Sequence, residues 1–276
     1  MKKLRLLKIY CNDHDGLSRE EYKVHLPKDF EFPHNLRYLH WQRCTLRSLP
    51  SSFYGEQLIE INLKSSNIKK LWKGSKCLGK LKGIDLSNSK QLVKMPKFSS
   101  MPNLERLNLE GCTSLRELHS SIGDLKWLTY LNLGGCEQLQ SLPTNMKFES
   151  LEKIPEIHGH LKELCLNGSG IKELPDSIGY LESLEILNLS NYETAIKELP
   201  NSIGSLTSLI SLSLTGCSKF EKFSDVFTNM RLLCFLNLCE SGIKELPGSI
   251  GCLESLRELD LSYCSNFEKF PEIQGI

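Results

Sequence analysis

Eleven cysteines and seven histidines supply most of the side chains in this 276-residue chain that could bind a metal ion or act as nucleophiles. No two cysteines are spaced as Cys-x-x-Cys, the pair on which zinc ribbons depend. His158, His160 and Cys165 come closest to a ligand cluster, but they lie in a stretch without a regular pattern. Arg5 and Lys8 interrupt the apolar core that a signal peptide would need. We therefore expect no metal site, and thiols that stay reduced.

One stretch, GSKCLGKL at residues 74–81, nearly matches the phosphate-binding loop GxxxxGK[ST]. Its last residue is Leu81, where that loop needs a hydroxyl to coordinate magnesium. Leu81 also falls at the start of a strand pattern, whereas the loop should open a helix. The sequence contains neither HExxH nor GxSxG. These residues predict no cofactor and no enzymatic activity.

A repeated pattern, LxxLxL, must position whatever surface the chain presents. Its first leucines are Leu36, Leu58, Leu81, Leu104, Leu128, Leu161, Leu184, Leu209, Leu233 and Leu256. Most steps are 22 to 25 residues, which is the range of leucine-rich repeats. SGIKELPDSIGYLESL (169–184) and SGIKELPGSIGCLESL (241–256) differ at two positions and lie 72 residues apart, or three repeats of 24.

The repeat also explains much of the cysteine content. Five cysteines occupy the ninth position of the pattern: Cys44, Cys112, Cys136, Cys217 and Cys264. Serine takes the same position in other repeats. A small side chain there is expected to turn inward and donate weakly to neighbouring backbone carbonyls. The cysteine pattern therefore favours a structural role.

Alternation within LxL points Leu107 and Leu109 to one face of a short strand and Asn108 to the other. A single repeat cannot bury its leucines, but stacked copies share a continuous core in which each buried Leu contributes ~1.5–3 kcal/mol. Pro175, in the second half of its repeat, suits an extended or turn segment. The sequence predicts an α/β solenoid: a leucine-rich-repeat horseshoe with short parallel strands on the concave face and 3₁₀ or irregular turns on the convex face. We expect residues 1–276 to form one domain of about 11 repeats.

Two steps are longer than the rest. We expect an insertion around residues 13–32 and an irregular or truncated repeat around 146–160. LEKIPEIHG (151–159) matches FEKFPEIQG (267–275), the back half of a repeat, without a strand of its own. We therefore expect the strand ladder to break or to be distorted there. The pattern also starts and stops in mid-repeat without a polar cap, so we expect the chain to be part of a longer protein.

Charge is divided unevenly along the chain. Residues 1–100 carry 20 Lys/Arg and 9 Asp/Glu, a net charge of +11, while residues 101–276 carry 14 and 24, a net charge of −10. One interpretation is two solvated surfaces of opposite sign; the other is a basic docking surface followed by an acidic one. No apolar run approaches 18 residues, so no membrane partner is expected. The lysines are spread over several repeat positions, which disfavours nucleic-acid binding.

Three stretches resemble one family closely: LPKDFEFPHNLRYLHWQRCTLRSLPSSF (26–53), LIEINLKSSNIKKLWKG (58–74) and LVKMPKFSSMPNLERLNLEGCTSL (92–115). They are similar to the leucine-rich-repeat region of plant TIR-NBS-LRR disease-resistance proteins. Neither a TIR domain nor a nucleotide-binding domain is present in this sequence, so the activities of those domains are not carried over. The resemblance implies an immune module of the cytoplasm or nucleus. Such a module senses a pathogen effector or a guarded host protein and restrains a nucleotide-binding switch domain until then.

The repeat geometry names a candidate binding surface for such a protein partner. Concave-face candidates are Tyr38, His40, Asn62, Asp85, Asn108, Tyr130, Asn132, Asn188, Ser213, Phe235, Asn237 and Asp260, with Cys165 at the same position. The aromatic members could anchor an interface or could shield neighbouring strands. Lys64, Lys69, Lys70 and Lys73 form a candidate basic surface for docking on the switch domain.

Two other functions compete with immune recognition. A non-immune intracellular leucine-rich-repeat scaffold would have the same fold and the same kind of surface. An extracellular receptor is less consistent with the sequence, because such plant repeats usually carry Gly-x-Ile-Pro and paired cysteine caps, whereas this chain has Ile-Lys-Glu-Leu-Pro.

Overall fold

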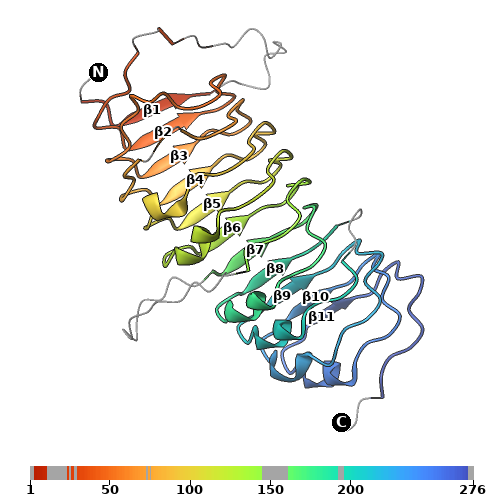
Figure 1. Ribbon diagram of the computed structural model, residues 1–276. Coiled ribbons are helices and arrows are strands. Elements are labelled where there is room, and N and C mark those ends of the chain that lie inside the picture. Colours follow the sequence, from red (N-terminus) through yellow and green to blue (C-terminus); the bar gives the residue numbers. More distant parts are fainter. Residues whose placement is uncertain are drawn as a thin grey trace.

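The computed structural model describes residues 3–10, 24, 26–27, 30–72, 74, 76–144, 161–191 and 196–272. Its strands form one parallel sheet in which every strand lies beside its neighbours in sequence order (Figure 1). The strands are β1 (Leu6–Ile9), β2 (Tyr38–Trp41), β3 (Glu60–Asn62), β4 (Gly83–Asp85), β5 (Arg106–Asn108), β6 (Tyr130–Asn132), β7 (Glu163–Cys165), β8 (Ile186–Asn188), β9 (Ser211–Ser213), β10 (Phe235–Asn237) and β11 (Glu258–Asp260). The described chain is an elongated stack with its two ends far apart. The predicted leucine-rich-repeat solenoid is confirmed.

The register of the sheet follows the leucine pattern. Ile61, Ile84, Leu107 and Leu131 are consecutive partners across β3 to β6, and each is buried. The residues before and after them on the strand point to the other side of the sheet. Each repeat thus buries one face of its strand against the leucines of its return segment, which no repeat could do alone.

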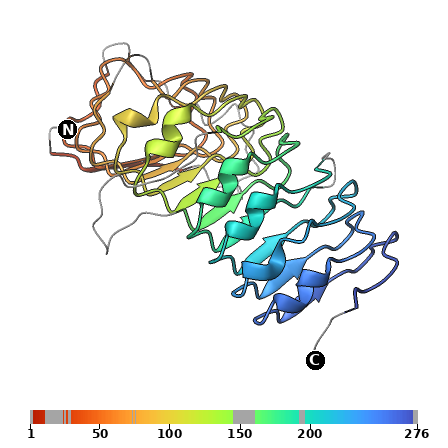
Figure 2. The same ribbon diagram turned by 60° about the horizontal axis from the view of Figure 1, so that its bottom comes forward.

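The return segments contain short 3₁₀ helices that line one side of the stack (Figure 2). They are η2 (Phe98–Ser100), η3 (Ser120–Asp124), η4 (Asp176–Tyr180), η5 (Asn201–Ser205), η6 (Phe227–Asn229) and η7 (Gly248–Cys252). Pro175 precedes η4 in extended conformation, and its carbonyl accepts a hydrogen bond from the Ile178 N–H at 2.9 Å. The 3₁₀ turns expected from the sequence are therefore present. Among the described residues, no helix has the length and apolar character that crossing a bilayer requires.

The expected break in the strand ladder is wrong. β6 and β7 are 30 residues apart in sequence, yet Tyr130, Leu131 and Asn132 pair in normal register with Glu163, Leu164 and Cys165. The extra sequence falls between two strands without changing how they pair. The whole irregular segment (146–160) lies outside the described residues, as does most of the insertion expected at 13–32. β1 likewise pairs directly with β2 across that insertion.

A left-handed residue ends the strand segment of almost every repeat. The eighth repeat position has positive φ at Arg43, Ser65, Asn88, Gly111, Gly135, Gly168, Gly216, Glu240 and Tyr263. Left-handed backbone costs an L-residue roughly 1–2 kcal/mol, whereas glycine adopts it freely. Five repeats therefore carry a strained side chain at this turn, and the gain from stacking offsets that strain.

The ninth repeat position turns inward, as expected. The Cys112 thiol donates to the Leu86 carbonyl at 3.3 Å, and the Cys136 thiol donates to the Leu109 carbonyl at 3.2 Å. Where serine takes the position, the Ser89 hydroxyl donates to the Leu63 carbonyl at 3.0 Å. Burial away from water raises the pKa of Cys44 to about 11 and that of Cys136 to about 12. These thiols stay protonated at neutral pH, and those of Cys112 and Cys136 serve as buried hydrogen-bond donors.

Candidate functional site

The open face of the sheet, here called the concave face, carries two parallel columns of side chains. The first concave column is Tyr38, Glu60, Gly83, Arg106, Tyr130, Glu163, Ile186, Ser211, Phe235 and Glu258. The second is His40, Asn62, Asp85, Asn108, Asn132, Cys165, Asn188, Ser213, Asn237 and Asp260. All twelve concave-face candidates from the sequence fall in these columns. Whether they bind a partner stays a prediction.

Much of the second column also has a structural task that the sequence analysis missed. The side-chain oxygens of Asp85, Asn108, Asn132, Asn188, Asn237 and Asp260 accept the backbone N–H two residues further along. Such a bond satisfies a donor at the point where the strand ends. In Asp260, hydrogen bonds from Ser262 hold the pKa of the carboxyl below its usual value. The Asn/Asp preference of this column therefore reflects strand-end capping.

Tyr130 is the centre of a polar cluster in the middle of the concave face. The Arg106 guanidinium carbon lies 4.3 Å from the centre of the Tyr130 ring. The Asn132 amide donates to the Tyr130 hydroxyl at 3.1 Å and to a Glu110 carboxylate oxygen at 3.3 Å. Partial burial is the main cause that raises the Tyr130 pKa, so the ring is neutral at physiological pH. These contacts fix the ring in one orientation, which suits an interface anchor.

A second cluster surrounds His40 near the N-terminal end of the sheet. Its Nδ1 lies 3.2 Å from the Tyr10 hydroxyl, and its Nε2 lies 3.0 Å from a Glu60 carboxylate oxygen. The Tyr38 ring meets the imidazole edge-on at 6.4 Å between centroids. The predicted candidates Tyr38 and His40 are therefore neighbours, and both are half-buried.

An apolar surface on β8 to β10 was only partly foreseen. The apolar strip, as it is called below, consists of Ile186, Ile210, Leu232 and Phe235, which are 37%, 37%, 53% and 42% exposed. Only Phe235 was predicted. The signal was present in the sequence, because the variable positions of LEILNL, LISLSL and LCFLNL hold apolar residues where other repeats hold charged ones.

The basic candidates occupy two different parts of the repeat. Lys64 lies at the margin of the concave face, where its ammonium group pairs with an Asp85 carboxylate oxygen at 3.2 Å. The backbones of Lys69 and Lys70 belong to the return segment, where both N–H groups donate to the Arg47 carbonyl. All three side chains are exposed. Lys73 lies outside the described residues.

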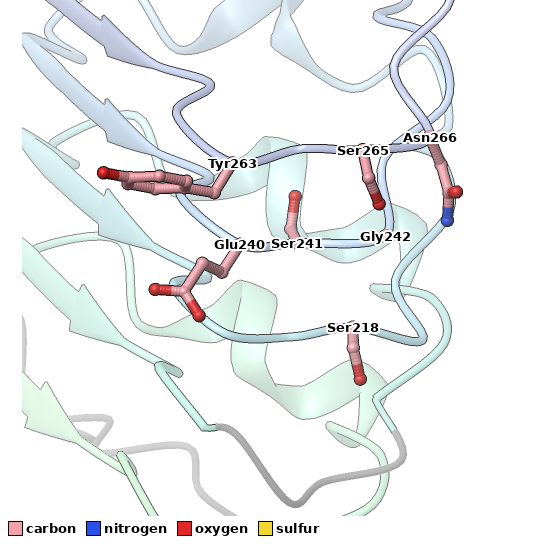
Figure 3. Close-up of a pocket in the computed structure, with 7 residues that line it drawn as sticks. All are labelled: Ser218, Glu240, Ser241, Gly242, Tyr263, Ser265 and Asn266. Carbon is pink, nitrogen blue, oxygen red and sulfur yellow. The ribbon is translucent and has the colours of Figure 1, made fainter.

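Two open pockets flank the sheet. One, of about 320 Å³, is lined by Lys3, Arg5, Asn35, Arg37 and Gln57. The other, of about 490 Å³, is lined by Ser218, Glu240, Ser241, Gly242, Tyr263, Ser265 and Asn266 (Figure 3). Its lining comes from the turns of three successive repeats, and the Tyr263 ring is directed away from the serine hydroxyls. The second lining contains serine hydroxyls and the Glu240 carboxylate, but in Figure 3 that carboxylate is directed away from the Ser241 hydroxyl.

The metal and nucleotide motifs find no support in the part of the chain that is described. No group of three or more His, Cys, Asp or Glu side chains there could hold a metal ion. His158 and His160 lie outside that part, and Cys165 belongs to the second concave column. Leu81, which stands where the phosphate-loop motif requires Ser or Thr, is fully buried in the core just before β4.

Comparison with known families agrees with this geometry. Residues 144–234 match a family model described as "Leucine-rich repeat region", and residues 57–76 and 255–275 match models described as "Leucine Rich Repeat". Among solved structures, the leucine-rich repeat domain of the type III effector XopL is similar with a TM-score of 0.65 and 25% identity, covering 78% of this chain and 71% of that one. An internalin from Listeria monocytogenes shares the fold at a TM-score of 0.58 and 18% identity, covering 86% and 67%.

Similar sequences are found among plant disease resistance proteins. Disease resistance protein RML1A of Arabidopsis thaliana is 37% identical over 69% of this chain and 20% of its own length. TMV resistance protein N of Nicotiana glutinosa is 34% identical over 82% of this chain and 20% of its own length. Disease resistance protein RPV1 of Vitis rotundifolia is 46% identical over 46% of this chain and 10% of its own length. The chain thus spans a fifth or less of the length of these relatives.

Proposed function

This chain is a leucine-rich-repeat protein related in sequence to plant disease resistance proteins, and we propose that it is a protein-recognition module of an intracellular immune receptor. Its ligand is a protein, either a pathogen effector or a host protein that such an effector alters. The concave face is the binding surface. The observation that carries the proposal is the pair of concave columns, in which side chains of very different character stand on a backbone of constant register.

A constant register separates folding from recognition. The buried residue of each strand is almost always Leu or Ile, so the core tolerates little change. The flanking positions include Tyr, Arg, Glu, Ile, Ser and Phe, and changing one of them leaves the leucine core intact. Tyr130, held by Arg106 and Asn132, supplies a fixed aromatic anchor at the centre of the surface. This combination supports recognition of an extended protein surface and offers no catalytic arrangement.

Site-specific photo-crosslinking in plant cells tests the proposal. A photoreactive residue replaces Tyr130 on the concave face or Tyr180 in η4 on the return side, and adducts are identified by mass spectrometry before and after pathogen challenge. We expect a defined protein adduct at position 130 that is missing at position 180. The Tyr38→Ala/Phe235→Ala variant, with an unchanged circular dichroism spectrum, should lose that adduct. Equal capture at both positions would contradict a concave binding face.

We also propose that the basic N-terminal repeats dock on an acidic surface of a nucleotide-binding switch domain in the cytoplasm or nucleus. The charge division of the chain supports this idea, because opposite charges favour association and set its register. Lys64 is partly neutralised by Asp85, so Lys69 and Lys70 are the residues that would contribute most. Contact with all of them requires a partner that reaches around the edge of the solenoid.

Charge reversal tests the docking. Lys69→Glu/Lys70→Glu should weaken association with the nucleotide-binding domain of a TIR-NBS-LRR receptor, and added salt should weaken association of the unaltered chain. Lys219→Glu/Lys222→Glu is the matched control, because both lysines are exposed in a return segment of the acidic half. Equal effects of the two double variants would exclude a specific basic docking surface.

A further inference from the structure

The apolar strip is continuous across three adjacent strands. Ile186 on β8 and Phe235 on β10 are both register partners of Ser211 on β9, so only a small hydroxyl side chain separates them. Ile210 precedes Ser211, and its backbone pairs with Glu185 on one side and Cys234 on the other. Leu232 lies two residues before Cys234, in the turn that leads into β10. Four large side chains, each more than a third exposed, therefore lie on or shortly before strands β8 to β10.

Carboxylates lie at both ends of the row that contains Ile186 and Phe235. In the register of the sheet, Glu163 on β7 lies next to Ile186, and Glu258 on β11 lies next to Phe235. Asp260 lies beside Glu258 on the same strand. The ion pairs among the described residues involve none of these three carboxylates.

The cations close to the strip are fewer. Lys162 pairs with Glu185 at 2.7 Å, and Arg231 lies 3.8 Å from Glu254. Arg257, which precedes Glu258 in the sequence, is the third cation beside the strip. The apolar strip therefore has a net negative border, in keeping with the net charge of −10 over residues 101–276.

We propose that the apolar strip binds a protein segment that presents apolar side chains flanked by lysine or arginine. This inference deepens the proposed function by naming the chemistry of the ligand. Burial of the four apolar side chains drives association, and the bordering carboxylates select for cationic flanks. An apolar segment with acidic flanks would place like charges together and bind more weakly. The same border repels the phosphates of nucleic acids and anionic lipids.

Matched synthetic peptides test the inference on the intact chain. The first peptide has a leucine–phenylalanine centre flanked by lysines, the second has the same centre flanked by glutamates, and the third has lysines around a serine–glycine centre. Binding is measured by fluorescence anisotropy. We expect the lysine-flanked apolar peptide to bind at least about tenfold more tightly than either of the others, and salt to reduce the difference between the two apolar peptides.

Variants locate the site. Ile210→Ser/Phe235→Ser should abolish the preference for an apolar centre. Ile59→Ser should not, because Ile59 has the repeat position of Ile210 but lies just before the distant strand β3. Glu163→Lys/Glu258→Lys should reverse the preference to the glutamate-flanked peptide. Equal binding of all three peptides, or a preference that survives these variants, would overturn the inference.

Two further outcomes separate this inference from the proposed function. If the chain alone forms dimers in sedimentation that Phe235→Ser dissolves, the strip is covered by a second copy and the inference is overturned. If photo-crosslinking identifies a concave-face ligand but the peptides show no charge preference, the proposed function stands and the inference fails. If the peptides bind as expected without any crosslinked ligand in cells, the strip binds this chemistry and the immune role fails.

Discussion

Arg106 and Tyr130, direct register partners on β5 and β6, stack with the guanidinium carbon 4.3 Å from the ring centre. The contact joins two neighbouring repeats through side chains on the exposed face of the sheet. A cation–π contact at an exposed site contributes about 0.5–1 kcal/mol. The contact therefore holds the aromatic ring in place and adds slightly to the stability of the fold.

A double-mutant cycle measures this contact. We expect Arg106→Ala and Tyr130→Phe each to lower the free energy of unfolding slightly, because Phe keeps the ring but loses the bond from Asn132. Arg106→Ala and Tyr130→Ala, measured singly and together by urea denaturation, should reveal a coupling energy of about 0.5–1 kcal/mol. A coupling energy near zero would mean that the stacking does not hold the ring.

Gly204 should not tolerate a methyl group. A Cβ at Gly204 would lie 2.7 Å from the Val226 carbonyl oxygen of the next repeat, and one at Gly179 would lie 2.6 Å from that of Ser202. Gly204→Ala should therefore lower the free energy of unfolding by about 1–3 kcal/mol. Gly248→Ala is the matched control, because nothing lies within 4 Å of its Cβ. Equal thermal midpoints for the two variants would contradict the close approach.

Glu240→Gly should raise stability. Glu240 has φ of 55°, where an L-residue carries roughly 1–2 kcal/mol of strain. Glycine removes that strain but gains about 0.5–1 kcal/mol of entropy in the unfolded chain, so we expect a net gain of up to about 1 kcal/mol. Glu240→Ala removes the same side chain and keeps the strain. A thermal midpoint no higher for the glycine variant than for the alanine variant would refute the argument.

The buried thiols should make stability fall in alkaline solution. Burial raises the pKa of Cys44 to about 11, that of Cys136 to about 12 and that of Cys217 to about 11, from 9.0 when exposed. Below pH about 9 the thiols are protonated in both the folded and the unfolded chain, so their contribution to the free energy of unfolding is fully present. Between about 9 and 11 the unfolded chain loses protons that the folded chain keeps, so the free energy of unfolding falls by up to ~1.4 kcal/mol per thiol and pH unit.

Serine substitution separates these thiols from other groups that titrate in the same range. Cys44→Ser/Cys136→Ser/Cys217→Ser should make the fall with pH shallower, because serine already fills the same position at Ser66 and Ser89. Cys252→Ser is the control, since that thiol is exposed in the folded chain. Denaturation curves between pH 8 and about 11 provide the measurement. Identical slopes for the triple variant and the parent chain would contradict the buried-thiol mechanism.

The leucine spacing was sufficient to predict the sheet, its face and the inward cysteines. Leu107 and its partners must be buried, and alternation then fixes where Asn108 and its neighbours point. The same reasoning failed at residues 146–160, because pairing of β6 with β7 depends on the strand pattern and not on the number of residues that connect the strands. Loop closure costs only ~0.6 kcal/mol for each doubling of loop length, which the stacked core readily offsets.

Other features depend on contacts that no local pattern contains. Lys64 was grouped with Lys69 and Lys70 by sequence proximity, yet the chain turns between them and Lys64 meets Asp85 of the next repeat. The left-handed turn is visible as glycine at Gly111 and Gly135 but is hidden where Arg43 takes the position. The apolar strip becomes a surface only when three repeats stack. Spacing predicted where side chains lie, but not which of them act together.

The unchanging register has an evolutionary consequence. Because each strand meets the next through the same backbone bonds, a duplicated block of repeats finds a compatible neighbour wherever it is joined. The near-identical stretches at 169–184 and 241–256 lie a whole number of repeats apart, as unequal exchange between tandem copies would leave them. Single exchanges of this kind can lengthen, shorten or rearrange the concave face of the encoded protein, while its hydrophobic interior is inherited intact.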